Sequence, residues 1–196
     1  MISNSTQGAI VKKIDDFNAA DRISVKLLEN SVHFLTGDIE EENIEECIKW
    51  LVFENLDTSK KKTLTLYINS AGGDLYQAFA LIDVMRNSTH SIRTIGIGNI
   101  MSAAFLIFAA GTQGERYIAV NTGIMCHQFS GGVEAKYHDI KAEMKENELL
   151  NKKMIDILRD ATGLAPSKIK AKLLPASDVY LTAQEALDFG IADHLL

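Results

Sequence analysis

The chain has 196 residues, a length typical of one domain, and 46% of them are hydrophobic, enough for a sizeable core. The formal net charge of -6, with no basic run longer than residues 60–62, argues against a nucleic-acid-binding protein. No apolar run approaches the ~20 residues that span a membrane, and the first residues lack the charged start and apolar core of a secretory signal.

The two cysteines do not suggest a disulfide framework. Cys47 falls in a predicted helix and Cys126 in a predicted strand, which favours a reducing compartment. We therefore expect a cytoplasmic protein, or one of an equivalent compartment such as an organelle stroma or matrix. Neither a membrane nor a nucleic-acid partner is expected.

The N-terminal segment differs from the rest of the chain. Residues 1–22 are polar apart from a small apolar cluster at Ile10, Val11 and Ile14, and they predict a mobile arm. Residues 23–196 predict a single domain. Its first strand is expected over residues 31–35, followed by a helix that begins at Asp38.

Alternating apolar and polar side chains predict the next strand over residues 63–69. A Ser-Ala-Gly-Gly-Asp segment, residues 70–74, joins it to a helix over 75–86. Paired glycines at such a junction let the backbone approach a ligand closely. Strands over 92–97, 116–120 and 124–128 then alternate with a helix after Ser102, which indicates an α/β domain.

A long helix is expected over about residues 135 to 161 and ends at Gly163. At ~1.5 Å per residue it is on the order of 40 Å long, about the width of the domain, so one end should project toward another subunit. Pro166 marks a short helix. The segment Thr182-Ala-Gln-Glu185 is a capping box that opens a final helix closed by Gly190.

Ser102 stands where an apolar strand meets an apolar helix, within residues 94–111. A serine there lies near unpaired backbone N–H groups and the positive end of the helix dipole, which stabilise negative charge. The same position suits a serine that only caps the helix. A catalytic serine needs an imidazole to take its proton and a carboxylate to orient that imidazole.

His127 is the best placed of the five histidines, because residues 124–128 form an apolar strand that ends at a glycine-rich loop. Active-site residues of parallel α/β sheets gather at such strand ends. A purely structural role for His127 remains open. Cys126 is its neighbour on the strand, points to the opposite face and is interpreted as core.

Asp178 precedes a short apolar segment and is the candidate acidic residue, although an aspartate here also suits a turn. The order Ser, His, Asp, without a Gly-x-Ser-x-Gly motif around Ser102, excludes the chymotrypsin, subtilisin and α/β-hydrolase folds. No metal site is expected, because the histidines and cysteines lack ligand spacing.

Several blocks, taken together and in order, resemble the Clp family of self-compartmentalised serine peptidases. The resemblance spans about residues 22–194 and is carried by residues 21–28, 34–37, 66–73, 98–102, 105–111, 125–128, 131–132 and 181–186. It implies a Clp/crotonase fold, an α/β arrangement of stacked strand-strand-helix turns from which a long helix projects. It also implies a homo-oligomer of heptameric rings stacked in pairs as a tetradecamer.

The resemblance further implies a serine endopeptidase that hydrolyses unfolded polypeptides inside the chamber, fed by an AAA+ unfoldase of the Clp type. ATP would be used by the unfoldase, and this chain would need no cofactor. The implied catalytic triad is Ser102, His127 and Asp178. The implied oxyanion hole consists of the backbone N–H groups of Gly73 and Ala103. The implied substrate-binding residues are Gly72, Phe129, Gly131 and Gly132.

The chain departs from the family's usual pattern beside the implied site. Ala71 replaces a proline before the two glycines, Phe129 replaces a proline after His-Gln, and Ser177 replaces an arginine before the acidic residue. These departures keep open an alternative, a catalytically weak or silent ring subunit that binds the unfoldase and shapes the chamber. An acyl-CoA hydratase or isomerase of the same fold is disfavoured, because no carboxylate lies between Thr94 and Gly114.

Overall fold

The computed structural model describes residues 18–131 and 136–196. Residues 1–17 of the expected arm, and Gly132, lie outside the described residues. Helix α1 (Ala19–Glu29) already occupies the last part of the span assigned to the arm. Its N-cap is Asn18, whose side chain accepts a hydrogen bond from the backbone N–H of Asp21.

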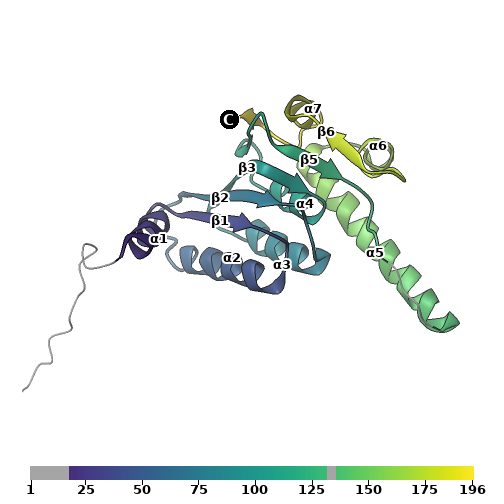
Figure 1. The fold of residues 1–196 in the computed structure, drawn as a ribbon, viewed down its shortest axis with the longest axis horizontal. Coiled ribbons are helices and arrows are strands. Elements are labelled where there is room, and N and C mark those ends of the chain that lie inside the picture. Colours follow the sequence, from purple (N-terminus) through teal and green to yellow (C-terminus); the bar gives the residue numbers. More distant parts are fainter. Residues whose placement is uncertain (1–17, 132–135) are drawn as a thin grey trace, which may run out of the picture.

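The strands of the described residues form one sheet. Strands β1, β2, β3, β4 and β7 are parallel and neighbour one another in that order, while β5 pairs parallel with β3 and β6 pairs antiparallel with β5 (Figure 1). The strands are β1 (Val32–Thr36), β2 (Thr63–Ser70), β3 (Ser91–Met101), β4 (Arg116–Ile118), β5 (Gly123–Cys126), β6 (Val179–Leu181) and β7 (His194–Leu195).

Four helices pack next to one another in chain order against this sheet: α2 (Glu41–Glu54), α3 (Leu75–Arg86), α4 (Ala103–Ala109) and α5 (Tyr137–Thr162). Two short helices, α6 (Pro166–Lys172) and α7 (Ala183–Asp188), follow in the C-terminal part (Figure 1). Side chains of β2 alternate between buried and half-buried, as expected for a sheet with one face under helices. The predicted α/β class is confirmed.

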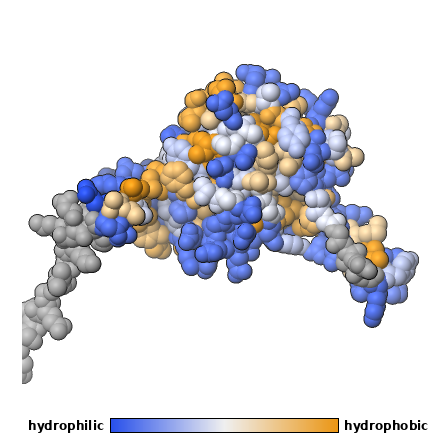
Figure 2. All heavy atoms as spheres, viewed as in Figure 1, coloured by the Kyte–Doolittle hydropathy of each residue, from blue (hydrophilic) through white to orange (hydrophobic). Residues whose placement is uncertain are grey.

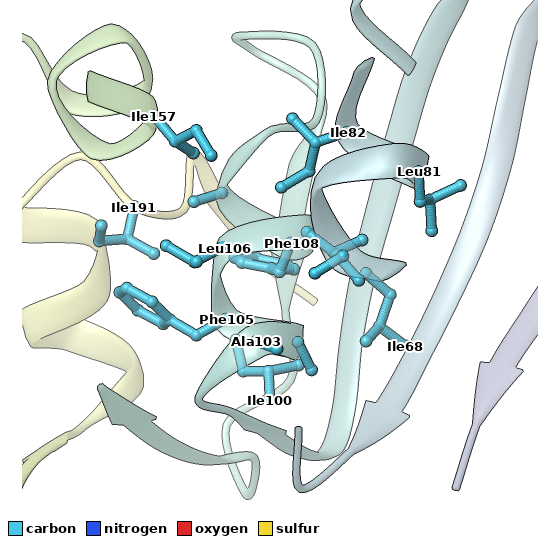
Figure 3. Close-up of a cluster of buried hydrophobic side chains, with 14 of the residues drawn as sticks. Ile68, Leu81, Ile82, Ile100, Ala103, Phe105, Leu106, Phe108, Ile157 and Ile191 are labelled. Atoms are coloured by element: carbon cyan, nitrogen blue, oxygen red, sulfur yellow. The ribbon is translucent and has the colours of Figure 1, made fainter. Parts of the chain in front are cut away.

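Helix α4, which begins directly after Ser102, lies at the centre of the core. Each of its seven residues is buried, and a helix that is apolar on every side is expected to be buried. Figure 3 shows Phe105, Leu106 and Phe108 surrounded by aliphatic side chains from other elements, among them Ile82 and Ile157. The segment that carries the serine is therefore held by close packing on all sides.

Several element boundaries differ from the sequence expectations. Strand β4 ends at Ile118 instead of residue 120, and β5 ends at Cys126 instead of residue 128, so His127 follows that strand instead of lying on it. Helix α2 begins at Glu41 instead of Asp38, because the backbone of Ile39 is paired with the glycine turn. The N–H of Ile39 donates to the Gly72 carbonyl at 2.8 Å, and its carbonyl accepts from the N–H of Asp74 at 2.8 Å. Strand β3 continues to Met101, beyond the predicted end at residue 97.

This longer strand changes partner along its length. Residues 94–96 of β3 pair with β4, whereas residues 99–101 pair with β5. Gly98 between them has φ +58°, and a Cβ atom there would collide with the side chain of Asn69. The side-chain Oδ1 atom of Asn69 accepts a hydrogen bond from the N–H of Asn99 at 3.0 Å. The switch brings the end of β3 beside β5.

Helix α5 packs against the domain mainly through its C-terminal half. Its buried residues are Leu150, Met154, Ile157 and Leu158, whereas the first half projects from the body (Figure 1). The projecting half exposes apolar side chains among polar ones (Figure 2), including Tyr137 at 65% and Met144 at 59% exposure. Gly163, with φ +70°, ends the helix as predicted. No helix of the described residues is long and apolar enough to cross a membrane.

Candidate active site

Pairing between β3 and β5 brings Ser102 to His127. Met101 and Met125 are register partners, and the N–H of Ser102 donates to the carbonyl of Met125 at 2.9 Å. Two residues further along, the Nε2 atom of His127 lies 2.7 Å from Oγ of Ser102. The serine hydroxyl and the imidazole that the sequence singled out are therefore in hydrogen-bond contact.

The backbone of Ser102 is strained. Its φ of 54° and ψ of -121° lie in a region that residues with a side chain rarely adopt, and such strain often occurs at functional sites. The Ser102 side chain makes no capping hydrogen bond to α4. The helix-cap interpretation therefore does not account for this serine, whose hydroxyl is directed to His127.

Asp178 directly precedes β6, the strand that pairs antiparallel with β5. Cys126 and Val179 are register partners in this antiparallel pair, so the next position opposes His127 to Asp178. The Asp178 side chain is exposed, and within the described residues no hydrogen bond joins it to the imidazole. The structure thus joins Ser102 to His127, whereas Asp178 makes no hydrogen bond to the imidazole in the part of the chain that is described.

Two backbone N–H groups lie close to the serine. The glycine turn packs directly on the start of α4: a Cβ on Gly72 would lie 2.6 Å from Cβ of Ser102 and 3.2 Å from the backbone nitrogen of Ala103. At the following residue, Gly73, a Cβ would lie 2.5 Å from the carbonyl oxygen of Ile39. Within residues 18–131 and 136–196, no acceptor is bonded to the N–H of Gly73 or Ala103.

A pocket of about 290 Å³ opens beside these groups. Its apolar lining comes mainly from Leu75, Phe129 and Met154. The Asp74 carboxylate at its edge accepts hydrogen bonds from the N–H groups of Tyr76 and Gln77 at 2.7 and 2.9 Å, and so caps α3. The complete lining is Gly73, Asp74, Leu75, Tyr76, Ser102, Ala103, His127, Gln128, Phe129, Ser130 and Met154.

The predicted substrate-binding residues are found only in part at this pocket. Phe129 lines it, and Gly131 lies against the Phe129 ring, where a Cβ would come within 2.8 Å of ring carbons. Gly72 does not line this pocket: it packs against Ser102 and lines a second, more polar hollow that contains Ile39 and Asp74. The prediction for Gly132 falls outside the described residues.

Three of the other four histidines, His33, His90 and His194, have structural surroundings, and the fourth, His138, is exposed on α5. His33 stacks on Trp50 at a ring separation of 5.2 Å, and His194 packs against Tyr117 at 4.7 Å. His90 is buried and its Nε2 lies 3.1 and 3.2 Å from the carbonyl oxygens of Glu54 and Asp57. None of these three contacts Ser102.

Cys126, the neighbour of His127, is buried and free, as is Cys47. Burial raises the pKa of the Cys126 thiol to about 12, so it remains protonated at neutral pH and is a poor nucleophile. The interpretation of Cys126 as a core residue is confirmed.

Two contacts at the site had no sequence signal. Helix α5 reaches the segment after His127 through Asn151, whose Oδ1 accepts from the N–H of Phe129 at 3.1 Å. It reaches the opposite rim through Glu146, which accepts a hydrogen bond from the Tyr76 hydroxyl. Neither residue type nor spacing distinguishes these two from other polar residues of a helix.

Two comparisons with known proteins bear on the family of this chain. The model of the Clp protease family matches residues 16–196. A protein of Leifsonia xyli subsp. xyli (strain CTCB07), named ATP-dependent Clp protease proteolytic subunit 1, is 34% identical over 170 residues, which cover 87% of this chain and 85% of that protein.

Proposed function

The chain belongs to the Clp protease family, and on this basis we propose that it is a serine endopeptidase whose nucleophile is Ser102. The observation that carries the proposal is the 2.7 Å contact between Ser102 Oγ and His127 Nε2. A hydroxyl becomes an effective nucleophile when a neighbouring imidazole can accept its proton.

In the proposed reaction, Ser102 Oγ attacks the carbonyl carbon of the scissile peptide bond while its proton passes to His127 Nε2. The imidazolium then gives this proton to the leaving amine, and the acyl-enzyme forms. Water, deprotonated by the same imidazole, hydrolyses the ester and restores the serine. Asp178 would orient the imidazole and stabilise its positive charge.

The N–H groups of Gly73 and Ala103 are proposed to bind the oxyanion of the tetrahedral intermediate. Their lack of any other acceptor among the described residues supports this role. Both are fixed before the reaction, one by the pairing of the glycine turn with Ile39 and the other by the buried start of α4. Each such donor typically contributes ~3 kcal/mol to transition-state stabilisation.

The apolar pocket formed by Leu75, Phe129 and Met154 would hold a substrate side chain, while an extended main chain would follow Gly72, Gly131 and Gly132. Substrates of this kind are unfolded polypeptides. The relative's name describes a subunit of an ATP-dependent protease. By analogy, the chain would form paired heptameric rings fed by an AAA+ unfoldase of the Clp type, and the unfoldase would consume the ATP.

The projecting half of α5 supports assembly, because its exposed apolar side chains would be buried against another copy. A second candidate function, a weak or silent ring subunit, is favoured by one observation: the exposed Asp178 carboxylate makes no hydrogen bond to His127 in the described residues. The strained Ser102 and its intact contact with the imidazole favour the active enzyme.

A fluorophosphonate probe tests the proposal directly. Size-fractionated protein should react covalently at Ser102 and hydrolyse a fluorogenic peptide, and the Ser102→Ala variant should do neither while eluting in the same oligomeric fraction. Mass spectrometry of the labelled peptide identifies the modified residue. An assembled wild-type protein that neither labels nor hydrolyses peptide would refute the peptidase and leave the silent subunit.

A further inference from the structure

We propose that Asn151 is a positioning residue that holds the segment after His127 and thereby keeps the imidazole aligned with Ser102. The inference rests on the proposed peptidase function and assigns a task to helix α5 within the site. The residues concerned are 127–130, which follow β5 where the chain leaves the sheet.

The sheet does not hold the residues that follow β5. Register pairs with β3 end at Met125, and those with β6 end at Cys126. His127 is the first residue beyond this ladder. The backbone of residues 127–130 therefore needs other partners to keep a fixed position, because unpaired loop backbone is the part of a structure that opens most readily.

Two hydrogen bonds hold this segment to other parts of the domain. The Nε2 amide of Gln128 donates to the carbonyl of Leu174 at 2.9 Å, which ties the segment to the residues after α6. The N–H of Phe129 donates to Oδ1 of Asn151 at 3.1 Å, which ties it to α5. Among the described residues, the Phe129 N–H donates to no acceptor other than Asn151.

Asn151 is itself held in one orientation. Its Nδ2 group donates to the carbonyl of Asn147, one turn earlier, at 3.0 Å, so the side-chain oxygen is the atom left to face Phe129. The side chain is half-buried at the point where α5 joins the domain, between Leu150 and Met154, which are 3% and 5% exposed. Met154 also lines the pocket. A rigid, packed helix therefore presents the acceptor.

The consequence for catalysis follows from the short distance along the chain. Phe129 lies two residues after His127, so a shift of its backbone is transmitted to an imidazole that must remain 2.7 Å from the serine oxygen. A misplacement of about 1 Å can cost a reaction ~100-fold, because proton transfer requires hydrogen-bond geometry. Loss of the tie should lower the turnover rate more than it weakens substrate binding.

Three variants of α5 separate positioning from a general structural effect. Asn151→Leu has a similar size and removes the acceptor, Asn151→Asp keeps an acceptor oxygen, and Lys152→Ala changes the adjacent exposed residue. In each variant, hydrogen exchange of the Phe129 amide, kcat and KM for a fluorogenic peptide, the rate of fluorophosphonate labelling at Ser102 and the oligomeric state are measured.

For Asn151→Leu we expect faster exchange at Phe129, with kcat and the labelling rate lowered about tenfold, KM changed less than about twofold and the oligomer intact. Lys152→Ala keeps both hydrogen bonds of Asn151 and should stay within about twofold of the wild type in every readout. Asn151→Asp keeps an acceptor for the Phe129 N–H but loses the Nδ2 donor to the Asn147 carbonyl, so its losses should be smaller than those of Asn151→Leu.

Unchanged exchange at Phe129 in Asn151→Leu would overturn the tie itself. Three results would overturn the positioning role. The first is faster exchange at Phe129 in Asn151→Leu with wild-type kcat and labelling rate. The others are a loss of kcat in Asn151→Asp equal to that in Asn151→Leu, and a loss of the assembled state that both variants share. A wild-type protein that does not label at Ser102 would instead refute the proposed function, and the inference would fall with it.

Discussion

The Nε2 atom of His127 lies 2.7 Å from Oγ of Ser102, although 25 residues separate the two in the chain. Their contact depends on the partner change of β3, which leaves β4 after Gly96 and pairs with β5 from Asn99 onward. Without that change, the serine at the end of β3 would not lie beside the strand that carries the imidazole.

Replacing Asp178 by asparagine should lower kcat by a factor of ~10⁴ with little change in the oligomer, because an orienting carboxylate fixes the histidine tautomer and stabilises the imidazolium. Peptide hydrolysis and gel filtration measure the two quantities. Ser177→Ala, at the adjacent exposed position, is the matched control and should retain activity. If Asp178→Asn hydrolyses peptide at the wild-type rate, the residue is only a turn aspartate.

Replacing Gly72 by alanine should abolish most activity and destabilise the protein. The new Cβ would lie 2.6 Å from Cβ of Ser102 and 2.9 Å from the carbonyl oxygen of Met101, at a φ of +106°. Gly37→Ala separates the clash from backbone strain, since Gly37 also has positive φ, +84°, but no atom within 4 Å of the new Cβ. We expect Gly37→Ala to cost about 1 kcal/mol of stability and to keep its kcat.

Thermal unfolding and kcat are measured for Gly72→Ala, Gly37→Ala and the wild type. Equal losses of kcat in Gly72→Ala and Gly37→Ala would show that strain alone is responsible, and that the close packing of the glycine turn on Ser102 is not important for the reaction.

Iodoacetamide should not inactivate the folded protein at neutral pH. Burial raises the pKa values of Cys47 and Cys126 to about 12, so each thiol is both inaccessible and protonated. Mass spectrometry after alkylation should find both cysteines modified only when denaturant is present. Rapid alkylation of Cys126 in the native protein, with loss of peptidase activity, would contradict its place in the core.

The ion pair between Arg116 and Asp193 should make stability depend on pH in the acidic range. Arg116 is buried, and its Nε and Nη2 atoms donate to the two Asp193 carboxylate oxygens at 2.8 and 2.6 Å. Burial by itself raises the pKa of Asp193, but the hydrogen bonds from Arg116, with a further one from the Gly114 N–H, hold that pKa below its usual value. The stabilisation is therefore fully present above the usual pKa of an aspartate and is lost as pH falls through the depressed pKa.

Asp193→Asn tests this pH dependence. At pH 7 the variant should be less stable by about 3 kcal/mol, because it leaves the buried Arg116 without its anionic partner. The difference from the wild type should shrink as pH falls below about 4, since the wild-type carboxylate is then neutralised as well. Urea unfolding between pH 3 and pH 7 measures both curves, and a difference that is constant with pH would argue against the ion pair.

Periodicity and caps predicted much of the fold. The helix expected over residues 75–86 is α3 (Leu75–Arg86), and the capping box at Thr182 opens α7. The late start of α2 could not be predicted, because it depends on backbone pairing between Ile39 and the glycine turn, about 33 residues away in sequence. The same holds for the two partners of β3, which local pattern does not encode.

The residues of the site likewise include some that could be predicted from the sequence and some that could not. Ser102 and His127 could be predicted because each stands at the end of an apolar strand, and the glycine turn because paired glycines are conspicuous. Asn151 could not, because its single hydrogen bond to a main-chain amide leaves no pattern in sequence. Residues whose chemical type is unusual for their place can be recognised in the sequence. Polar residues that bind only backbone groups cannot.

Residues 102, 127 and 178 directly flank three strands of one sheet: Ser102 follows β3, His127 follows β5 and Asp178 precedes β6. Because β5 pairs with both β3 and β6, alignment of the site depends on strand register. Because neighbouring side chains alternate in direction, a slip of one residue in β5 would present Cys126 to the serine in place of His127. Such a misfolded chain could still bury most of its apolar residues. The fraction of molecules that react with a serine-directed probe would therefore measure how many chains have β5 paired in the correct register. Thermal unfolding does not distinguish these chains from the misfolded ones.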